Sequence, residues 1–280
     1  MSGTAPLLGL VLAGGRSSRM RRDKATLQYH GESQLDWACG QLAPHVQTVF
    51  VSVRVDQRDD PARQGQPHIV DTHQDMGPIA GIAAAQAARP DAAWLVLACD
   101  LPFLDDSTLA RLCAQRDTSQ FATAYRSNSD GLPEPLCAIY EPRSHAALLQ
   151  AIAAGRACPR KFLINSPTHL LELGAVHALD NVNSSAEYVT AMQDLAPNAA
   201  ALNVRVQYFA LLREQAGRSD EALSTRSHTA AQLYAELRQR YPFSLGPETL
   251  RVAINTEFAD WSQPLVDGDL VVFIPPVAGG

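Results

Sequence analysis

The sequence lacks the cysteine and histidine patterns of metal-binding and disulfide-linked proteins. Its five cysteines form no Cys-x-x-Cys pair, and its eight histidines show neither His-x-His nor His-Glu-x-x-His spacing. An odd number of widely spaced cysteines argues against a disulfide framework or a zinc cluster and is typical of a reducing compartment. We therefore expect a cytoplasmic, soluble protein without a cysteine- or histidine-based metal site.

Long apolar runs and an excess of positive charge are also missing. No stretch approaches the ~20 apolar residues of a membrane span, and no basic region precedes the short apolar stretch near the N-terminus, as it would in an export signal. The formal net charge is −6, so any basic site has to be local. The sequence thus predicts neither a membrane nor a nucleic-acid partner.

Lysine is rare, because only Lys24 and Lys161 are lysines among the 23 basic residues. Lys24 follows a loop rich in glycine and arginine. A lysine ammonium is a compact charge on a flexible stem and suits a phosphate group. Without its neighbours, Lys24 would be interpreted as a solvated loop residue.

The first 195 residues alternate between predicted strands and helices. Continuous apolar runs predict buried strands, and capping signals followed by helical periodicity predict the helices between them. We expect strands at 7–13, 48–53, 68–71, 94–98, 121–125 and 135–140, and helices at 33–44, 78–88, 106–116, 142–154 and 185–195. This alternation is typical of a Rossmann-like α/β fold with a doubly wound, mostly parallel sheet.

The pattern changes near residue 195. Residues 196–202 lack periodicity and predict a linker between a first domain at 1–195 and a second at 203–280. In the second domain we expect strands at 203–212, 250–255 and 270–276, a short helix ending at Gly217, and a helix at 230–241 capped by Thr229. These elements predict a small α+β fold, the β-grasp of ubiquitin-like proteins. Phe209, Leu211 and Phe273 could belong to its core or to a partner surface, and we expect them in the core.

The segment Leu12-Ala13-Gly14-Gly15 is the strongest candidate for a ligand site in the first domain. The first strand brings the two glycines to the carboxyl edge of the sheet, where ligands of such sheets bind. Glycine lets backbone N–H groups approach phosphate oxygens closely. Arg16, Arg19 and Lys24 add charge for a triphosphate, although the spacing is neither a Walker A loop nor G-x-G-x-x-G.

These residues carry a specific resemblance. L-A-G-G-x-S-x-R-M followed by a lysine resembles the signature of molybdenum cofactor guanylyltransferases and related nucleotidyltransferases, although Arg21-Arg22 replaces a position where that family usually has a glycine. The resemblance implies GTP as substrate. It places Arg19 and Lys24 in catalysis and assigns GTP contacts to Leu12, Ala13, Gly14, Gly15 and Lys24.

Asp100 follows the apolar run at 94–98 and is the candidate ligand of Mg²⁺. An acidic residue at this edge of the sheet is well placed to hold Mg²⁺ against nucleotide phosphates. The alternative is that Asp100 only caps the next turn. In the family that the chain resembles, the aspartate of a C-D-x-P segment binds magnesium, and Asp100 matches it.

The resemblance extends to four more polar residues. Asp71, before the Gly77-Pro78 loop, takes the position of an aspartate that contacts the nucleoside, with Asp75 as a competing candidate. Ser52 takes the place of an asparagine that contacts GTP in some relatives. Asn181 and Asn183 resemble a segment associated with the molybdopterin side, and they could also cap the helix at 185. A basic cluster of Arg156, Arg160 and Lys161 could meet the acceptor phosphate or form a solvated helix end.

Residues 203–280 resemble the small subunit of molybdopterin synthase, a ubiquitin-like sulfur carrier. The matching pieces are the segments 206–214, 252–255 and 267–269 and the final run Phe273-Ile274-Pro275-Pro276-Val277-Ala278-Gly279-Gly280. The resemblance implies that the Gly280 carboxylate becomes a thiocarboxylate. It also implies two partners, an adenylating enzyme and the large subunit of molybdopterin synthase.

The implied activity of the first domain is transfer of GMP from GTP to molybdopterin. A cytidylyl- or sugar-phosphate nucleotidyltransferase is the alternative, and a ubiquitin-like docking module is the alternative for the second domain.

Overall fold

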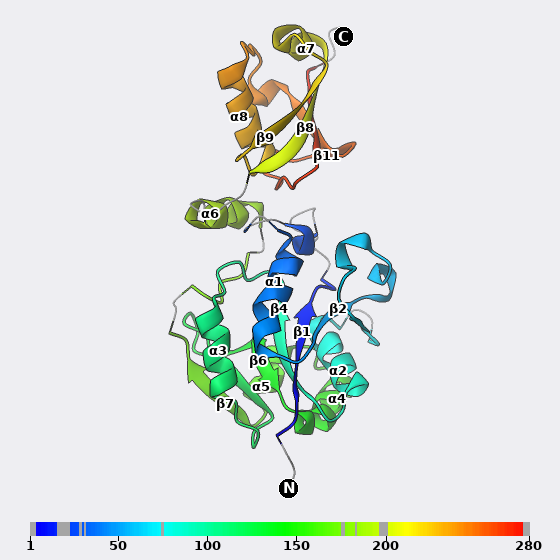
Figure 1. Cartoon of the computed structure of the whole chain (residues 1–280), viewed down its shortest axis with the longest axis vertical. Helices are drawn as coiled ribbons and strands as arrows, with labels where there is room; N and C mark the ends of the chain where they lie inside the picture. Colours follow the sequence, from blue (N-terminus) through cyan, green and yellow to red (C-terminus); the bar gives the residue numbers. More distant parts are fainter. Residues whose placement is uncertain are drawn as a thin grey trace. The chain divides into compact units, whose positions relative to one another are not determined.

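The computed structural model describes residues 4–15, 23–27, 30, 32–73, 76–174, 177–182, 184–195 and 201–276. The chain divides into two compact units (Figure 1). Unit 1 consists of Met1–Arg16 and Gln34–Asn181, and unit 2 consists of Ser17–Ser33 and Val182–Gly280. No helix among the described residues is both long and apolar enough to cross a membrane.

Unit 1 is built around a seven-stranded sheet in the order β3-β2-β1-β4-β6-β5-β7. The strands are β1 Leu7–Leu12, β2 Val49–Val53, β3 His68–Val70, β4 Ala93–Ala98, β5 Ala122–Arg126, β6 Pro133–Tyr140 and β7 Thr168–Glu172. Neighbours from β3 to β4 are parallel, while β6 runs antiparallel to both β4 and β5. The predicted mostly parallel sheet is therefore confirmed.

Helices cover both faces of this sheet. They are α1 Gln34–Leu42, α2 Pro78–Ala88, α3 Asp106–Ala114, α4 His145–Ala153 and α5 Pro159–Ile164. Apolar residues of α2, α4 and α5 form one core with alternate residues of the central strands, such as Leu8 and Leu10 of β1. Gly9 points to the other face, toward Leu42 of α1. Figure 1 shows α3 on one side of the strands and α2 and α4 on the other. The sheet is thus doubly wound.

Unit 2 contains a five-stranded sheet in the order β11-β10-β12-β8-β9. Its elements are η1 Lys24–Thr26, α6 Ser185–Leu195, β8 Leu202–Tyr208, α7 Ala210–Ala216, β9 Asp220–Thr225, α8 Ala230–Arg240, β10 Arg251–Ile254, β11 Glu257–Ala259 and β12 Leu270–Ile274. The last strand lies at the centre, parallel to the first, and α8 packs on the apolar face. This is the β-grasp arrangement that the sequence predicts.

Hydrogen bonds hold polar residues of the segments 252–255 and 267–269 in unit 2. Asn255 donates from its side chain to Asp269 (2.8 Å) and accepts from the Leu270 backbone N–H (2.9 Å). Asp267 accepts from the Asn203 backbone N–H (2.6 Å). These contacts fix where β12 starts relative to β10 and β8, and they explain why polar residues occur at these positions of a small domain.

Candidate functional site

The register of the parallel strands places the candidate residues of unit 1 along one edge. Leu12 pairs with Ser52 on one side and with Ala98 on the other. Gly14 and Asp100 therefore both lie two residues beyond a paired position. Carboxyl ends of adjacent parallel strands meet at the same edge of a sheet, which is where ligands of open α/β sheets bind.

Ser52 and Asp71 form a hydrogen-bonded pair at this edge. The Ser52 hydroxyl donates a hydrogen bond to Asp71 Oδ1 (2.7 Å), and the Ser52 side chain is buried. Burial raises the pKa of Asp71, while the Ser52 hydrogen bond and the Arg54 charge act in the opposite direction. The Asp71 carboxylate is thus incompletely compensated, which favours a ligand that donates hydrogen bonds to it.

Gly81 of α2 leaves the space that this pair occupies. A Cβ at position 81 would overlap Ser52 Oγ and would lie 2.9 Å from Leu12 Cδ2 and 3.2 Å from Asp71 Oδ1. Only glycine fits there without movement of the helix or the pair. Gly81 therefore lets α2 approach the carboxyl edge closely.

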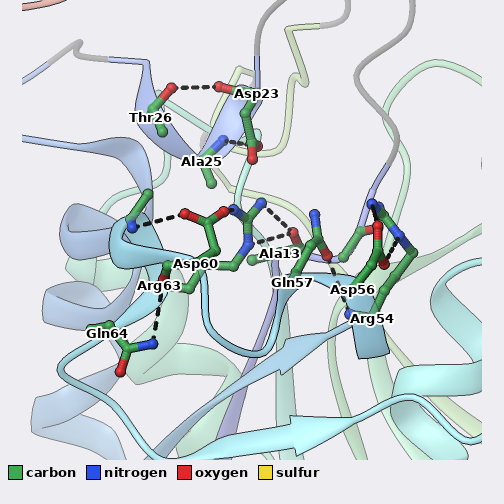
Figure 2. Close-up of polar contacts among 12 residues, drawn as sticks. Ala13, Asp23, Ala25, Thr26, Arg54, Asp56, Gln57, Asp60, Arg63 and Gln64 are labelled. Carbon is green, nitrogen blue, oxygen red and sulfur yellow. Dashed lines mark hydrogen bonds and ion pairs between the residues drawn. The ribbon is translucent and has the colours of Figure 1, made fainter.

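The glycine segment after β1 is contacted by two arginines (Figure 2). Arg54 donates from Nη1 to the Gly14 carbonyl oxygen (2.6 Å). Arg63 donates from Nη2 and Nε to the Ala13 carbonyl oxygen (2.9 and 3.4 Å). A Cβ at Gly15 would meet no atom of the described residues within 4 Å. The sequence did not single out either arginine, because each bond spans at least 40 positions and ends on a backbone atom.

A pocket of about 270 Å³ lies beside the end of β4. Asp100, Asn181 and Arg160 all line it. The structure therefore brings together the candidate metal ligand, one candidate acceptor residue and one member of the basic cluster. Arg160 forms ion pairs with Asp130 (3.0 Å) and Glu134 (2.8 Å) and is thus not simply a solvated helix end.

Asp100 fits the way proteins usually hold Mg²⁺. The described residues include no group of three or more His, Cys, Asp or Glu side chains placed to enclose a metal. Mg²⁺ is commonly bound by one or two carboxylates together with substrate phosphates and water. A single carboxylate at a pocket on the ligand edge of the sheet matches that donor set.

The start of α6 tests the alternative that Asn181 and Asn183 cap this helix. Ser184 and Glu187 form reciprocal hydrogen bonds between side chain and backbone N–H (3.2 and 3.1 Å), a capping box. Ser184 is therefore the N-cap, and the capping role predicted for the asparagines is wrong for Asn181. Asn183 lies outside the described residues.

Three predicted site residues, Arg19, Lys24 and Asp75, are not among the described residues of unit 1. Lys24 belongs to η1 of unit 2, where Asp23 caps the turn by accepting from the Ala25 N–H (3.0 Å) (Figure 2). Arg19 lies outside the described residues, as does the competing Asp75. Their predicted roles stay predictions.

In unit 2, the structure follows the chain to Pro276, so Gly280 also lies outside the described residues. Burial decreases from Phe273, which has no exposed surface, to Pro276, which is exposed. The expected core position of Phe273 is confirmed. It is wrong for Phe209 and Leu211, which are 45% and 38% exposed, because they flank the start of α7, whose buried residues are Leu212 and Ala216.

Comparisons with known proteins match two separate parts of the chain. Residues 9–170 match the family model described as the MobA-like NTP transferase domain, and residues 206–280 match the model of the ThiS family. The chain is 34% identical over 183 residues to the molybdenum cofactor biosynthesis bifunctional protein of Synechocystis sp., which covers 65% of this chain and 53% of that protein. The chain thus spans about half the length of this relative.

A second relative is matched over nearly its whole length. The probable molybdenum cofactor guanylyltransferase of Nostoc sp. is 29% identical over 197 residues, which cover 69% of this chain and 95% of that protein. The crystal structure of molybdopterin-guanine dinucleotide biosynthesis protein A from Archaeoglobus fulgidus superposes with a TM-score of 0.57 at 22% identity, covering 68% of this chain and 99% of that one. The structural likeness supports the fold of unit 1.

Proposed function

Because the chain belongs to the MobA-like NTP transferase family, we propose that unit 1 transfers GMP from GTP to molybdopterin. This proposal rests on a row of backbone and carboxylate groups at the carboxyl edge of the sheet. Backbone groups of Gly14 and Gly15, the carboxylate of Asp71 and the carboxylate of Asp100 lie after neighbouring parallel strands. Such a row suits a ligand with a base, a phosphate chain and a metal ion.

The chemistry of Asp71 favours guanine over cytosine. A carboxylate accepts hydrogen bonds only, and guanine offers N1–H and its amino group side by side. Cytosine places an acceptor, N3, beside its amino group, so an ionised Asp71 would face a lone pair. Ser52 donates to Asp71 Oδ1 and so orients the carboxylate.

In the proposed reaction, a phosphate oxygen of molybdopterin bonds to the α-phosphorus of GTP. The bond between the α-phosphorus and the bridging oxygen to the β-phosphorus breaks, and pyrophosphate leaves with the electron pair. Since the attacking phosphate is already anionic, no general base is required. The chain acts by positioning and charge: the glycine amides and Lys24 bind phosphates, and Asn181 and Arg160 orient the acceptor.

Asp100 would hold Mg²⁺ in this site. A bound Mg²⁺ neutralises charge that develops on the phosphate oxygens. Leu12, Ala13 and Ser52 complete the proposed nucleotide contacts, with Arg19 and Asn183 as proposed contacts to phosphate and acceptor.

Release of pyrophosphate by the full chain tests this function. The chain is supplied with Mg²⁺, molybdopterin and one of GTP, CTP, ATP or UTP. We expect release with GTP at a kcat/KM at least tenfold above that with CTP. Release with CTP alone would establish the cytidylyl alternative, and release without dependence on molybdopterin would contradict transfer.

For residues 203–280 we propose a sulfur-carrier function, supported by the β-grasp fold and the match to the ThiS family. An adenylating enzyme would activate the Gly280 carboxylate, and the resulting thiocarboxylate would enter the large subunit of molybdopterin synthase. We propose domain boundaries of 1–195 and 203–280, with 196–202 as linker. The cytoplasm is the proposed location, since all five cysteines are free.

The intact mass of the chain tests the carrier function after exposure to an adenylating partner, ATP and a sulfur donor. We expect the mass increase that replaces one oxygen by sulfur, and no increase after deletion of Gly280. If the wild-type chain shows no such increase and the deletion variant keeps most of its affinity for its partner, the docking-module alternative is favoured.

A further inference from the structure

The two arginines that contact the glycine segment come from one stretch of chain beyond β2. Arg54 directly follows β2 and starts the 3₁₀ turn η3 Val55–Gln57, and Arg63 ends the 3₁₀ turn η4 Pro61–Arg63. Both side chains turn back over the end of β1 (Figure 2). They bond successive carbonyl groups, those of Ala13 and Gly14.

Each guanidinium is itself held by a carboxylate. Arg54 forms a bidentate pair with Asp56, with both nitrogen–oxygen distances at 2.9 Å. Arg63 pairs with Asp60, and its side chain has no exposed surface. The ring of His68 also hydrogen-bonds the Arg63 backbone carbonyl (2.7 Å). A buried guanidinium held between a carboxylate and a backbone carbonyl is a costly feature in a loop, unless its direction matters.

The direction of these carbonyls sets the direction of the following amides. In a trans peptide the C=O and the next N–H point in opposite directions. The bond from Arg63 to Ala13 therefore turns the Gly14 N–H away from Arg63, and the bond from Arg54 to Gly14 turns the Gly15 N–H away from Arg54. Among the described residues, neither amide donates a hydrogen bond. Two adjacent N–H groups are thus oriented and available.

We propose that Arg54 and Arg63 are positioning residues that orient the Gly14 and Gly15 amides for an anionic nucleotide. This inference rests on the proposed function and deepens it. Because the carbonyls are held before the ligand arrives, the amides need not reorganise upon binding. Arginine is suited to this role since its planar fork can bond a carbonyl and a carboxylate at fixed angles, which a lysine ammonium does not.

The binding of Mg²⁺·GTP by the full chain tests the proposal, with Arg54→Gln, Arg54→Lys and Arg63→Gln as variants. Arg116→Gln is the matched control. Like Arg63, Arg116 is nearly buried and pairs with a carboxylate, that of Glu141. It also donates to a backbone carbonyl, that of Ala5 (3.0 Å), but this carbonyl lies at the amino end of β1. Circular dichroism sets a temperature at which every variant is folded.

We expect the Kd for GTP to rise at least tenfold in Arg54→Gln and Arg63→Gln, and to stay within twofold in Arg116→Gln. Arg54→Lys keeps the charge but not the fork, so its Kd should rise at least fivefold. The amide resonances of Gly14 and Gly15 should shift in the nucleotide-free Arg54 and Arg63 variants and not in the control.

Three results would overturn the proposal. The first is wild-type affinity for GTP in the Arg54→Gln and Arg63→Gln variants. The second is full affinity in Arg54→Lys, which would show that Arg54 acts only through its charge. The third is an equal loss of affinity in Arg116→Gln, which would show that the effect is one of stability. A wild-type chain that binds CTP but not GTP contradicts the proposed function alone, and the same variants then test the positioning role with CTP.

Discussion

Ser52 donates a hydrogen bond to Asp71 from the neighbouring strand, and Gly81 of α2 packs directly against both side chains. Ser52 occupies one position on Oδ1 and leaves the rest of the carboxylate for other donors. The pair thus joins three elements, β2, β3 and α2, at the edge where we propose that the guanine binds.

Replacement of Asp71 by asparagine should weaken GTP binding and relieve a burial cost. Loss of hydrogen bonds to a charged group costs about 1.5–3 kcal/mol, so the KM for GTP should rise roughly 10- to 100-fold. Steady-state kinetics measure this change. An unchanged KM for GTP would exclude Asp71 as the base contact.

The same variant has a predicted pH dependence of stability. Since the native pKa of Asp71 is raised above 3.8, its stabilising contribution is complete below pH 3.8 and is lost as pH rises through the native pKa. The Asp71→Asn variant cannot lose it. Urea unfolding of both proteins should therefore show a stability difference that grows in favour of the variant from about pH 4 to pH 7. A difference independent of pH would contradict the raised pKa.

Replacement of Gly81 by alanine should disrupt the pair. The added Cβ would overlap Ser52 Oγ, and we expect a loss of about 1–3 kcal/mol of unfolding free energy. Gly40 is the control, because it lies in helix α1, is exposed, and has open space around its Cβ position. Gly40→Ala should gain about 0.5–1 kcal/mol. Equal effects of the two substitutions would refute the close approach of α2.

Replacement of Gly15 by alanine separates folding from binding. No atom of the described part of the chain lies within 4 Å of the added Cβ, and Gly15 is not among the glycines with positive φ. Thermal unfolding should therefore show equal or greater stability, by up to about 1 kcal/mol. The affinity for GTP should nevertheless fall, because the methyl group would stand between the backbone amides and the ligand. Unchanged affinity would show that the ligand does not approach this residue.

Replacement of Asp100 by asparagine should remove metal-dependent catalysis. We expect kcat to fall by at least about 100-fold, the usual scale for loss of a group that stabilises transition-state charge. Asp91→Asn, in an exposed turn, is the control and should leave kcat unchanged. If excess Mg²⁺ restores wild-type kcat to the Asp100 variant, the carboxylate only contributes metal affinity. A kcat unaffected by the substitution would exclude Asp100 from the site.

The strands and helices with strong local signals could be predicted from the sequence. The apolar runs of β1 and β4 and the capped helices α6 and α8 were found within one or two residues. The sequence did not predict β7 and β9, which are partly exposed and lie at the sheet edges, or the three-residue strand β11. Few of their residues are both buried and apolar, so neither alternation nor a continuous apolar run marks them in the sequence.

The site was predictable where a residue type carries its own chemistry. Gly14, Asp71 and Asp100 could be placed at one edge because each follows a predicted strand of a mostly parallel sheet. Arg54 and Arg63 could not, because their bonds end on backbone carbonyls distant in sequence. The requirement for glycine at position 81 likewise arises from the packing of α2 against β2 and β3, which no local pattern contains.

Transfer of label from GTP to the pterin tests the central proposal most directly. The full chain is incubated with Mg²⁺, molybdopterin and GTP labelled at the α-phosphate, and separately with CTP labelled in the same way. We predict that the α-phosphate label of GTP appears in a guanine dinucleotide of molybdopterin, with one pyrophosphate released for each label transferred. Label transferred only from CTP, or pyrophosphate released without a labelled pterin product, would contradict it.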